Sequence, residues 1–344
     1  MGKPARLPPD LDGLNQGGAG GRPPAGRSSP LRAVFWNARQ QRARAVWLIL
    51  LPVVGAYVAL IASEVVATAA GLPVQVGFAL WSFAALAAAL ALVRFSHRYL
   101  GARSLRDYGL VIDRRWRLDL AAGLVIGLVA AAAPILLVLA MGWAEIGAVF
   151  DAGELELLPG FAAVAFGVLC VGIWEEIAMR GVFLSNAADG FRAWLSPRRA
   201  VAAAVALSGF VFGLAHIANP DYAPLILTWV LAGLVLGGIY VLTGNLALPI
   251  GAHITINAVY QMGLVRTDTA GTEHFSAVMR VTPDPTLAFL QLGGVIDIGL
   301  WVTLGLLTYL WLRISRGKVS VDLAALKLDT PPQPRQPDAT VVST

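Results

Sequence analysis

Charge and cysteine are both scarce in this sequence. Only 14% of its 344 residues are Asp, Glu, Lys or Arg, whereas 57% are hydrophobic and the mean hydropathy is +0.68. A soluble globular domain carries about 25% charged residues, so the chain lacks the polar surface that such a domain presents to water. The one cysteine, Cys170, can form no intrachain disulfide, and CxxC zinc or thiol sites are excluded. The composition predicts a membrane protein.

Several common chemical signatures are missing too. The sequence contains no GxSxG elbow, no HExxH zinc motif and no glycine-rich phosphate loop ending in Lys-Ser or Lys-Thr. Its net charge of +5 does not indicate a nucleic-acid partner, because the basic residues lie mostly in the tails and between apolar segments. The first apolar segment begins near Val46, too late for a secretory signal peptide, so we expect no cleaved signal.

Long apolar segments, in contrast, are abundant. About eight of them approach the roughly 20 residues that a helix needs to cross a bilayer. Their approximate ranges are 46–70, 75–95, 119–142, 160–184, 201–217, 223–243, 246–265 and 287–312. We therefore predict an all-α fold, a polytopic transmembrane helical bundle with about eight spans. Arginines concentrate in alternate connections, and the connection 144–158 is acidic, which places both termini in the cytoplasm of a cell-membrane protein.

The polar segments divide the chain further. We expect a disordered, basic cytoplasmic tail at residues 1–45, three spans at 46–142, a second membrane region at 160–312 that holds the motifs of residues 175–257, and a cytoplasmic C-terminal tail at 313–344. Two connections leave alternatives open. Residues 103–118 and 186–197 mix aromatic residues with arginines, and each is either an ordinary basic loop or a segment on the membrane surface.

Two adjacent carboxylates lie well inside the fourth apolar segment. Glu175 and Glu176 would each cost several kcal/mol at such depth unless paired or solvated, so they are candidates for function. Arg180 follows Glu176 by one helical turn, and this spacing predicts a salt bridge. Glu175 points about 100° away and is freer to face a cavity. The alternative is a buried ion pair that only ties two helices together.

Two of the four histidines also fall in apolar segments. Phe212 and His216 are one turn apart, as are His253 and Asn257, and each pair alone is also consistent with packing or an interhelical hydrogen bond. Together with the carboxylates they indicate more. A carboxylate beside an imidazole can take a proton from water and return it to a leaving amine, and an imidazole with a carboxamide can donate to a developing oxyanion. Peptide hydrolysis needs both sets.

These residues resemble the motifs of a known family. EEIAMR (Glu175–Arg180) resembles the EExxxR motif of the CPBP family, the CAAX-type and bacteriocin-processing intramembrane proteases. FGLAH (Phe212–His216) and HITIN (His253–Asn257) resemble its FxxxH and HxxxN motifs, and the three occur in the family's order over roughly residues 160–265. The resemblance implies a glutamate-dependent intramembrane endopeptidase that acts on membrane proteins or lipidated peptides in the bilayer.

The resemblance also implies roles for the residues. Glu175 and His216 would activate water, and Glu176 would assist or orient with Arg180 as its partner. His253 and Asn257 would form the oxyanion site, with Phe212 in support. A metalloprotease is the alternative, in which Glu175, His216 and His253 would bind zinc. We favour no cofactor, because the further ligands would be carboxylate or amide and the spacing fixes no tetrahedron.

Two functions of other classes compete with proteolysis. One is an ion- or proton-coupled transporter that uses Glu175, Glu176 and Asp297, and the other is a catalytically silent membrane scaffold. The depth of His216 raises a separate difficulty. It lies about 24 Å along the fifth span if that span starts at Ala200, whereas Glu175 is near the cytoplasmic side of its own span. We therefore expect the fifth span to start later, or to enter through a bent interfacial segment.

Overall fold

The structure is a computed structural model that describes residues 30–38, 40–217, 226–260, 265–267, 275–284, 286–287, 295–324 and 326–327. Within this part of the chain, seven helices are long and apolar enough to cross a membrane. They are α2 (Ala45–Ala69), α3 (Val74–Tyr99), α4 (Arg114–Ala140), the continuous helix Leu157–Phe191, α7 (Pro197–Ala215), α8 (Ile226–Thr243) and α10 (Val295–Arg316). An eighth apolar helix, α9 (Ala247–Tyr260), is shorter. The predicted helical membrane bundle is confirmed.

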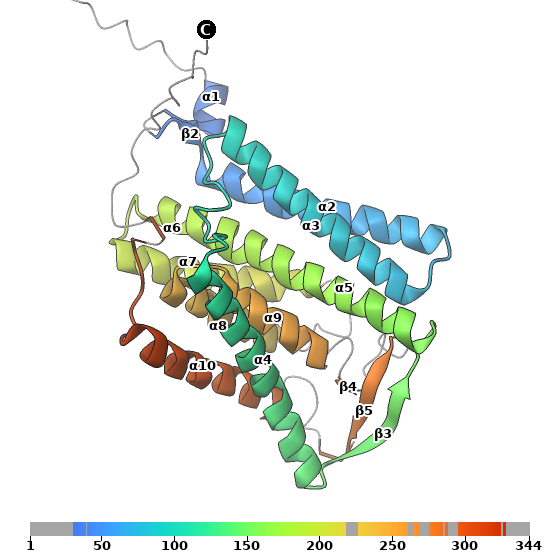
Figure 1. Cartoon of the computed structure of the whole chain (residues 1–344). Coiled ribbons are helices and arrows are strands. Elements are labelled where there is room, and N and C mark those ends of the chain that lie inside the picture. Colours follow the sequence, from blue (N-terminus) through green and yellow to red (C-terminus); the bar gives the residue numbers. More distant parts are fainter. Residues whose placement is uncertain are drawn as a thin grey trace, which may run out of the picture.

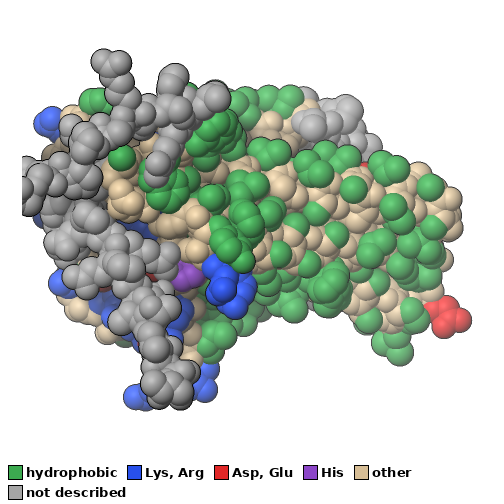
Figure 2. Space-filling model, turned by 90° about the horizontal axis from the view of Figure 1, so that it is seen from above, with side chains coloured by type: hydrophobic (Ala, Val, Ile, Leu, Met, Phe, Trp, Pro, Cys, Tyr) green, Lys and Arg blue, Asp and Glu red, His purple; other side chains and the backbone are tan. Residues whose placement is uncertain are grey.

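The helices pack in neighbouring pairs around one main core (Figure 1). α2 and α3 form one pair, α7 and α8 a second, and α4 packs along α9. The helix Leu157–Phe191 contacts α3, α7 and α9 and so lies between the pairs. The largest cluster of buried side chains joins this helix to α4, α7, α8 and α9. Figure 2 shows that hydrophobic side chains cover most of one face, while Lys and Arg gather towards the end where α6 and the N-terminal strands lie.

The helix Leu157–Phe191 has three parts. α5 (Leu157–Glu175) is followed by a π-helix, η1 (Glu176–Leu184), and then by α6 (Ser185–Phe191). The sequence predicted a connection at 186–197, but α6 is largely buried and continues the span. The sequence did not predict this continuation, because α6 contains polar residues. In the folded protein, tertiary hydrogen bonds satisfy these polar side chains and allow their burial.

This extra length brings Glu175 level with His216. Glu175 lies roughly 24 Å from Phe191 along its helix, and His216 lies about 28 Å from Pro197 along α7. α7 begins at Pro197, so the expectation that the fifth span starts later, or bends, is wrong. Glu175 and His216 lie at a similar depth because the helix Leu157–Phe191 extends beyond its apolar segment.

A small sheet caps the opposite end of the bundle from α6 (Figure 1). β3 (Ala144–Asp151) pairs antiparallel with β5 (Ala277–Pro283), which pairs parallel with β4 (Val265–Thr267). An ion pair between Asp151 and Arg280 joins β3 to β5. The sequence predicted only connections at these places, since the apolar alternation of β3 is interrupted by glycine and acidic residues.

The tails carry more structure than expected. Within the predicted disordered segment 1–45, residues Pro30–Phe35 form α1, and β1 (Trp36–Asn37) pairs with β2 (Arg42–Ala43). In the C-terminal tail, Leu326 is buried, and the Arg103 guanidinium donates to its carbonyl oxygen at 2.6 Å. The first residues of this tail therefore pack back onto the bundle.

The connection at 103–118 is a turn-rich loop as far as Asp113. Its last residues, from Arg114, already belong to α4, whose N-terminus is capped by Asp113. Tyr108 is buried and accepts a hydrogen bond from Asn186. Burial raises the pKa of Tyr108 to about 12. The segment is thus packed against the end of α6.

Candidate active site

The fourth span changes its helical type where the carboxylates occur. Glu175 is the last residue of α5, and Glu176 begins the π-helix η1, all nine residues of which are buried. π-Helices are rare and occur frequently at functional sites, because the wider turn redirects side chains. Glu176 and Arg180 therefore both point into the protein interior, and Glu175 precedes the change.

Glu176 is held from two sides. Its Oε1 lies 3.0 Å from Nη1 of Arg180 and accepts a hydrogen bond of 2.7 Å from Nδ1 of His253. Glu176 and Arg180 have no exposed side-chain surface. The Arg180 guanidinium also lies 4.5 Å from the ring centroid of Phe212. The predicted salt bridge is present, and it connects η1 to α7 and α9 as well.

Glu175 occupies a different environment from its neighbour. Its side chain is 13% exposed, and its Oε2 lies 3.7 Å from Nε2 of His253. His253 therefore stands between two carboxylates, with Nδ1 towards Glu176 and Nε2 towards Glu175. If its imidazole is protonated, it and Arg180 balance the two negative charges, which reduces the cost of burying them.

His216 is fixed at the end of α7. Its Nδ1 donates a hydrogen bond of 2.7 Å to the carbonyl oxygen of Phe212, so Nε2 carries the lone pair of the neutral ring. The imidazole stacks on Trp229 of α8, with centroids 4.2 Å apart and planes at 9°. Glu175 and His253 both interact electrostatically with His216. α7 and α8 thus hold a basic nitrogen near the Glu175 carboxylate.

α9 carries the remaining two predicted residues. His253 and Asn257 are one turn apart and both buried. α9 approaches α4 and α5 closely because glycines line the contacts. A Cβ at Gly123 of α4 would lie 2.3 Å from the carbonyl oxygen of Leu248, and one at Gly172 of α5 would lie 2.5 Å from Ile254. Small residues permit this approach between membrane helices, and it places His253 against the glutamates.

The comparison with known proteins matches this same region. Residues 157–259, which run from α5 to α9, match the family described as Rce1-like, type II CAAX prenyl endopeptidase. This part of the chain is similar to the CAAX-type intramembrane proteases. No curated protein and no solved structure matches the chain. The match confirms the resemblance drawn from the three motifs and supports a protease class. The seven apolar helices support an integral, multi-pass membrane protein.

The candidate site has supporting residues that the sequence did not reveal. Ser185 donates to the Tyr240 hydroxyl at 3.1 Å, Tyr240 donates to the carbonyl oxygen of Tyr108, and Asn186 donates to the Tyr108 hydroxyl. This buried series of hydrogen bonds holds α6, which continues η1, in place. Trp229, which stacks on His216, was missed as well. The only available signal was a pair of polar residues, Ser185 and Asn186, directly after an apolar segment.

Two other predictions concern charges outside these contacts. Asp297 lies in α10, but its side chain is outside the part of the chain that the structure describes, and so is His274.

For the zinc alternative, no group of three His, Cys, Asp or Glu side chains that could hold a metal ion occurs among the described residues. Glu175, His216 and His253 therefore do not fit a tetrahedral ligand set here, and we derive no step through a metal.

Proposed function

We propose that this protein is an intramembrane endopeptidase in which Glu175 and His216 activate the water that attacks the peptide bond. One observation carries the proposal. Of two adjacent carboxylates, Glu176 is fully enclosed by Arg180 and His253, whereas Glu175 keeps 13% of its side-chain surface exposed. Only Glu175 can meet water without breaking the ion pair. Glu176 is then the residue that orients His253.

The reaction begins with the removal of a proton from water. A carboxylate and an imidazole nitrogen are both suitable acceptors. Because Nδ1 of His216 is bound to the Phe212 carbonyl oxygen, its Nε2 is the basic atom. As the proton moves to Glu175 or His216, the water oxygen bonds to the carbonyl carbon of the substrate, and the C=O electron pair moves to the carbonyl oxygen.

The resulting oxyanion needs hydrogen-bond donors. His253 donates from Nδ1 to Glu176, so a proton on Nε2 makes it a charged donor. The Asn257 carboxamide lies one turn along the same helix face and supplies a second N–H group. Such donors act strongly in a site that excludes water. The intermediate then breaks its C–N bond, and the proton held by Glu175 or His216 passes to the leaving amine.

The substrate class follows from the surroundings of the site. Two of the helices that carry it, Leu157–Phe191 and α7, are long and apolar enough to cross a membrane, so a substrate must reach it from within or beside the membrane. We favour a membrane-associated protein or a lipidated peptide. Two forms of this substrate are tested separately. One is a prenylated C-terminal peptide, as the family description names, and the other is an unprenylated membrane peptide of the bacteriocin-maturation kind that the motif resemblance implies.

The test is cleavage by the purified full-length protein in liposomes, with a farnesylated CAAX peptide and a matched unprenylated membrane peptide as probes. Glu175→Gln is nearly isosteric and should lower kcat/KM at least about 100-fold, the lower range for general-base catalysis, without changing the melting temperature. Glu64→Gln, which removes an exposed carboxylate of α2, is the control and should cleave normally. Cleavage by Glu175→Gln within about tenfold of the native rate would exclude the proposed role.

A zinc chelator forms a second arm of the same assay. In the proposed mechanism the chelator leaves the rate unchanged. A zinc-dependent site would lose its bound hydroxide and most of its rate. Stoichiometric zinc that disappears in both His216→Ala and His253→Ala, with activity restored when zinc is added back, would replace the proposed mechanism with the metal-dependent alternative.

The proposal includes an orientation in the cell membrane, with both termini in the cytoplasm. Arginines gather at the end that carries α6 and the N-terminal strands (Figure 2), which is the cytoplasmic end under the positive-inside rule. Single cysteines introduced into a Cys170→Ala background test it. A cysteine at Glu154 should be labelled from outside, and one at Arg106 only from the cytoplasmic side. Labelling of both from one side would contradict this orientation.

A further inference from the structure

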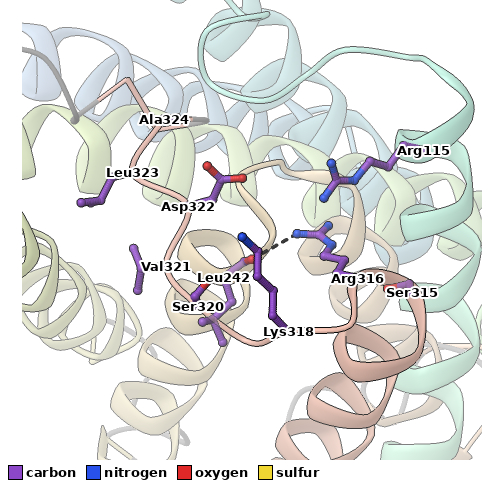
Figure 3. Close-up of a pocket in the computed structure, with 10 residues that line it drawn as sticks. All are labelled: Arg115, Leu242, Ser315, Arg316, Lys318, Ser320, Val321, Asp322, Leu323 and Ala324. Atoms are coloured by element: carbon purple, nitrogen blue, oxygen red, sulfur yellow. Dashed lines mark hydrogen bonds between the residues drawn. The ribbon is translucent and has the colours of Figure 1, made fainter.

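A basic cavity lies at the arginine-rich end of the bundle, on the other side from α2 and α3 (Figure 3). It has a volume of about 680 Å³ and is formed by the first turn of α4, the last turns of α8 and α10, and the segment that follows α10. Arg115, Arg316 and Lys318 line it, together with Ser320 and one carboxylate, Asp322. None of these residues belongs to the protease site.

Arg316 forms a fixed cationic wall of this cavity. Its Nη2 lies 2.7 Å from Asp119 Oδ2, and its Nη1 donates to the carbonyl oxygens of Leu242 and Thr243 at 3.1 and 2.9 Å. Asp119 in turn accepts hydrogen bonds from Asn245 and Trp311. The guanidinium is therefore held in place before any ligand arrives.

Two further cations are exposed beside Arg316. Among the described residues, no carboxylate lies within ion-pair distance of Arg115 or Lys318. Figure 3 shows the side chains of Arg115, Arg316 and Lys318 directed into the same space, into which the Asp322 carboxylate also points. Arg115 and Arg316 repel each other as like charges. An anion between these groups would relieve the repulsion.

The remaining wall is built by the chain after α10. The amide of Asp322 donates to the carbonyl oxygen of Val241 at 3.1 Å, and Leu326 N–H donates to the carbonyl oxygen of Asp322. Leu326 is 1% exposed, and Arg103 binds its carbonyl oxygen. The cavity is therefore preformed. A ligand does not have to order a loose segment when it binds, and so avoids the entropy cost that such ordering adds to binding.

We propose that this cavity binds a phosphate group at the membrane surface. Guanidinium and ammonium groups are the side chains that bind phosphate oxygens, and the Ser320 hydroxyl adds a donor. A volume of this size accommodates a small polar ligand, since ligand cavities measure about 300–1,000 Å³. The ends of α4 and α10 lie where apolar helix meets the arginine-rich end, which is the level of phospholipid headgroups. The phosphate comes either from an anionic lipid headgroup or from a soluble phosphoester.

The experiment separates these sources by direct binding. Delipidated full-length protein in detergent is mixed with phosphatidylglycerol, phosphatidylcholine or glycerol 1-phosphate, and bound ligand is counted by native mass spectrometry. The test variant combines Arg115→Gln and Lys318→Gln. The control combines Arg198→Gln and Arg199→Gln, which removes the same charge from exposed positions of α7 outside the cavity. A third variant, Arg115→Lys with Lys318→Arg, keeps the charge.

Native, control and charge-keeping proteins should bind phosphatidylglycerol more tightly than phosphatidylcholine, and the test variant should bind it at least about tenfold more weakly. That result assigns the cavity to a lipid phosphate. Saturable glycerol 1-phosphate binding that is lost in the test variant, with no preference between the lipids, assigns it to a soluble phosphoester. Absence of saturable binding, or equal losses in the test and control variants, overturns the proposal. Melting temperatures confirm that each variant is folded.

Discussion

Two buried carboxylates, each paired with an arginine, lie in different parts of this bundle. Asp119 of α4 lies 2.7 Å from Arg316, and Glu176 of η1 lies 3.0 Å from Arg180. Both oxygens of Asp119 accept hydrogen bonds, from Asn245, Trp311 and Arg316. The Glu176–Arg180 pair differs. No described residue makes an aligned hydrogen bond with Oε2 of Glu176 or with the three side-chain nitrogens of Arg180.

The difference separates a structural ion pair from one that belongs to a reactive site. Buried polar atoms are nearly always hydrogen-bonded, so each exception requires an explanation. Asp119 joins α4, α10 and the turn before α9 with both of its oxygens bonded, and only Nε of its partner Arg316 lacks a hydrogen bond among the described residues. Glu176 and Arg180 retain hydrogen-bonding capacity, and Glu175, with its exposed surface, lies next to them. Burial of an ion pair alone does not mark a site, whereas remaining capacity beside an accessible carboxylate does.

Loss of Arg180 should have the largest effect on stability. Arg180→Ala leaves Glu176 as an unpaired charge with no exposed surface, and breaking a buried pair costs about 3–5 kcal/mol. Thermal unfolding in detergent measures this loss, and cleavage should also fall because Glu176, which binds His253, loses the arginine that holds it in place. Arg180→Met combined with Glu176→Gln removes both charges and should restore stability but not activity. A melting curve of Arg180→Ala that equals the native one would show that the pair is not buried.

Changing Asp119 should have a smaller effect, confined to stability. Asp119→Asn removes a charged acceptor, and the loss of such hydrogen bonds costs about 1–3 kcal/mol. Arg316 keeps its two backbone carbonyl partners, which limits the damage. Cleavage per folded molecule should stay native at temperatures below the new melting point. Loss of cleavage by the folded variant would place Asp119 in the reactive site and remove the contrast with Glu176.

The two ion pairs also show what the sequence could reveal. The Glu176–Arg180 pair was predicted because both residues lie on one helix, where spacing fixes their proximity. Asp119 was overlooked, since its three partners come from distant segments and a carboxylate at the start of a span is ordinary. The approach of His253 to both glutamates was equally invisible, because it depends on the close packing of α9 against glycines of α4 and α5.

The fold was predicted to a similar degree. Apolar length located the helices, because the thickness of a bilayer sets that length directly. The continuation of the fourth span through Ser185 and Asn186 was missed, since tertiary partners make those polar residues compatible with burial. In the sheet, β3 pairs with β5, which lies more than 100 residues further along the chain, and no local pattern reveals this pairing.

The stack of Trp229 on His216 supplies the smallest expected effect. Trp229→Leu removes an aromatic face 4.2 Å from the imidazole, and such contacts contribute about 0.5–1.5 kcal/mol. If the stack positions the basic Nε2, kcat should fall about three- to tenfold, in line with that energy, with little change in KM.

Trp229→Phe keeps a stacking surface and should recover most of the rate. Trp194→Leu, at a side chain that is 81% exposed, is the matched control. Equal rates for Trp229→Leu and Trp194→Leu would show that the hydrogen bond from His216 Nδ1 to the Phe212 carbonyl oxygen orients the ring by itself. A rise in KM without a fall in kcat would instead place Trp229 against the substrate.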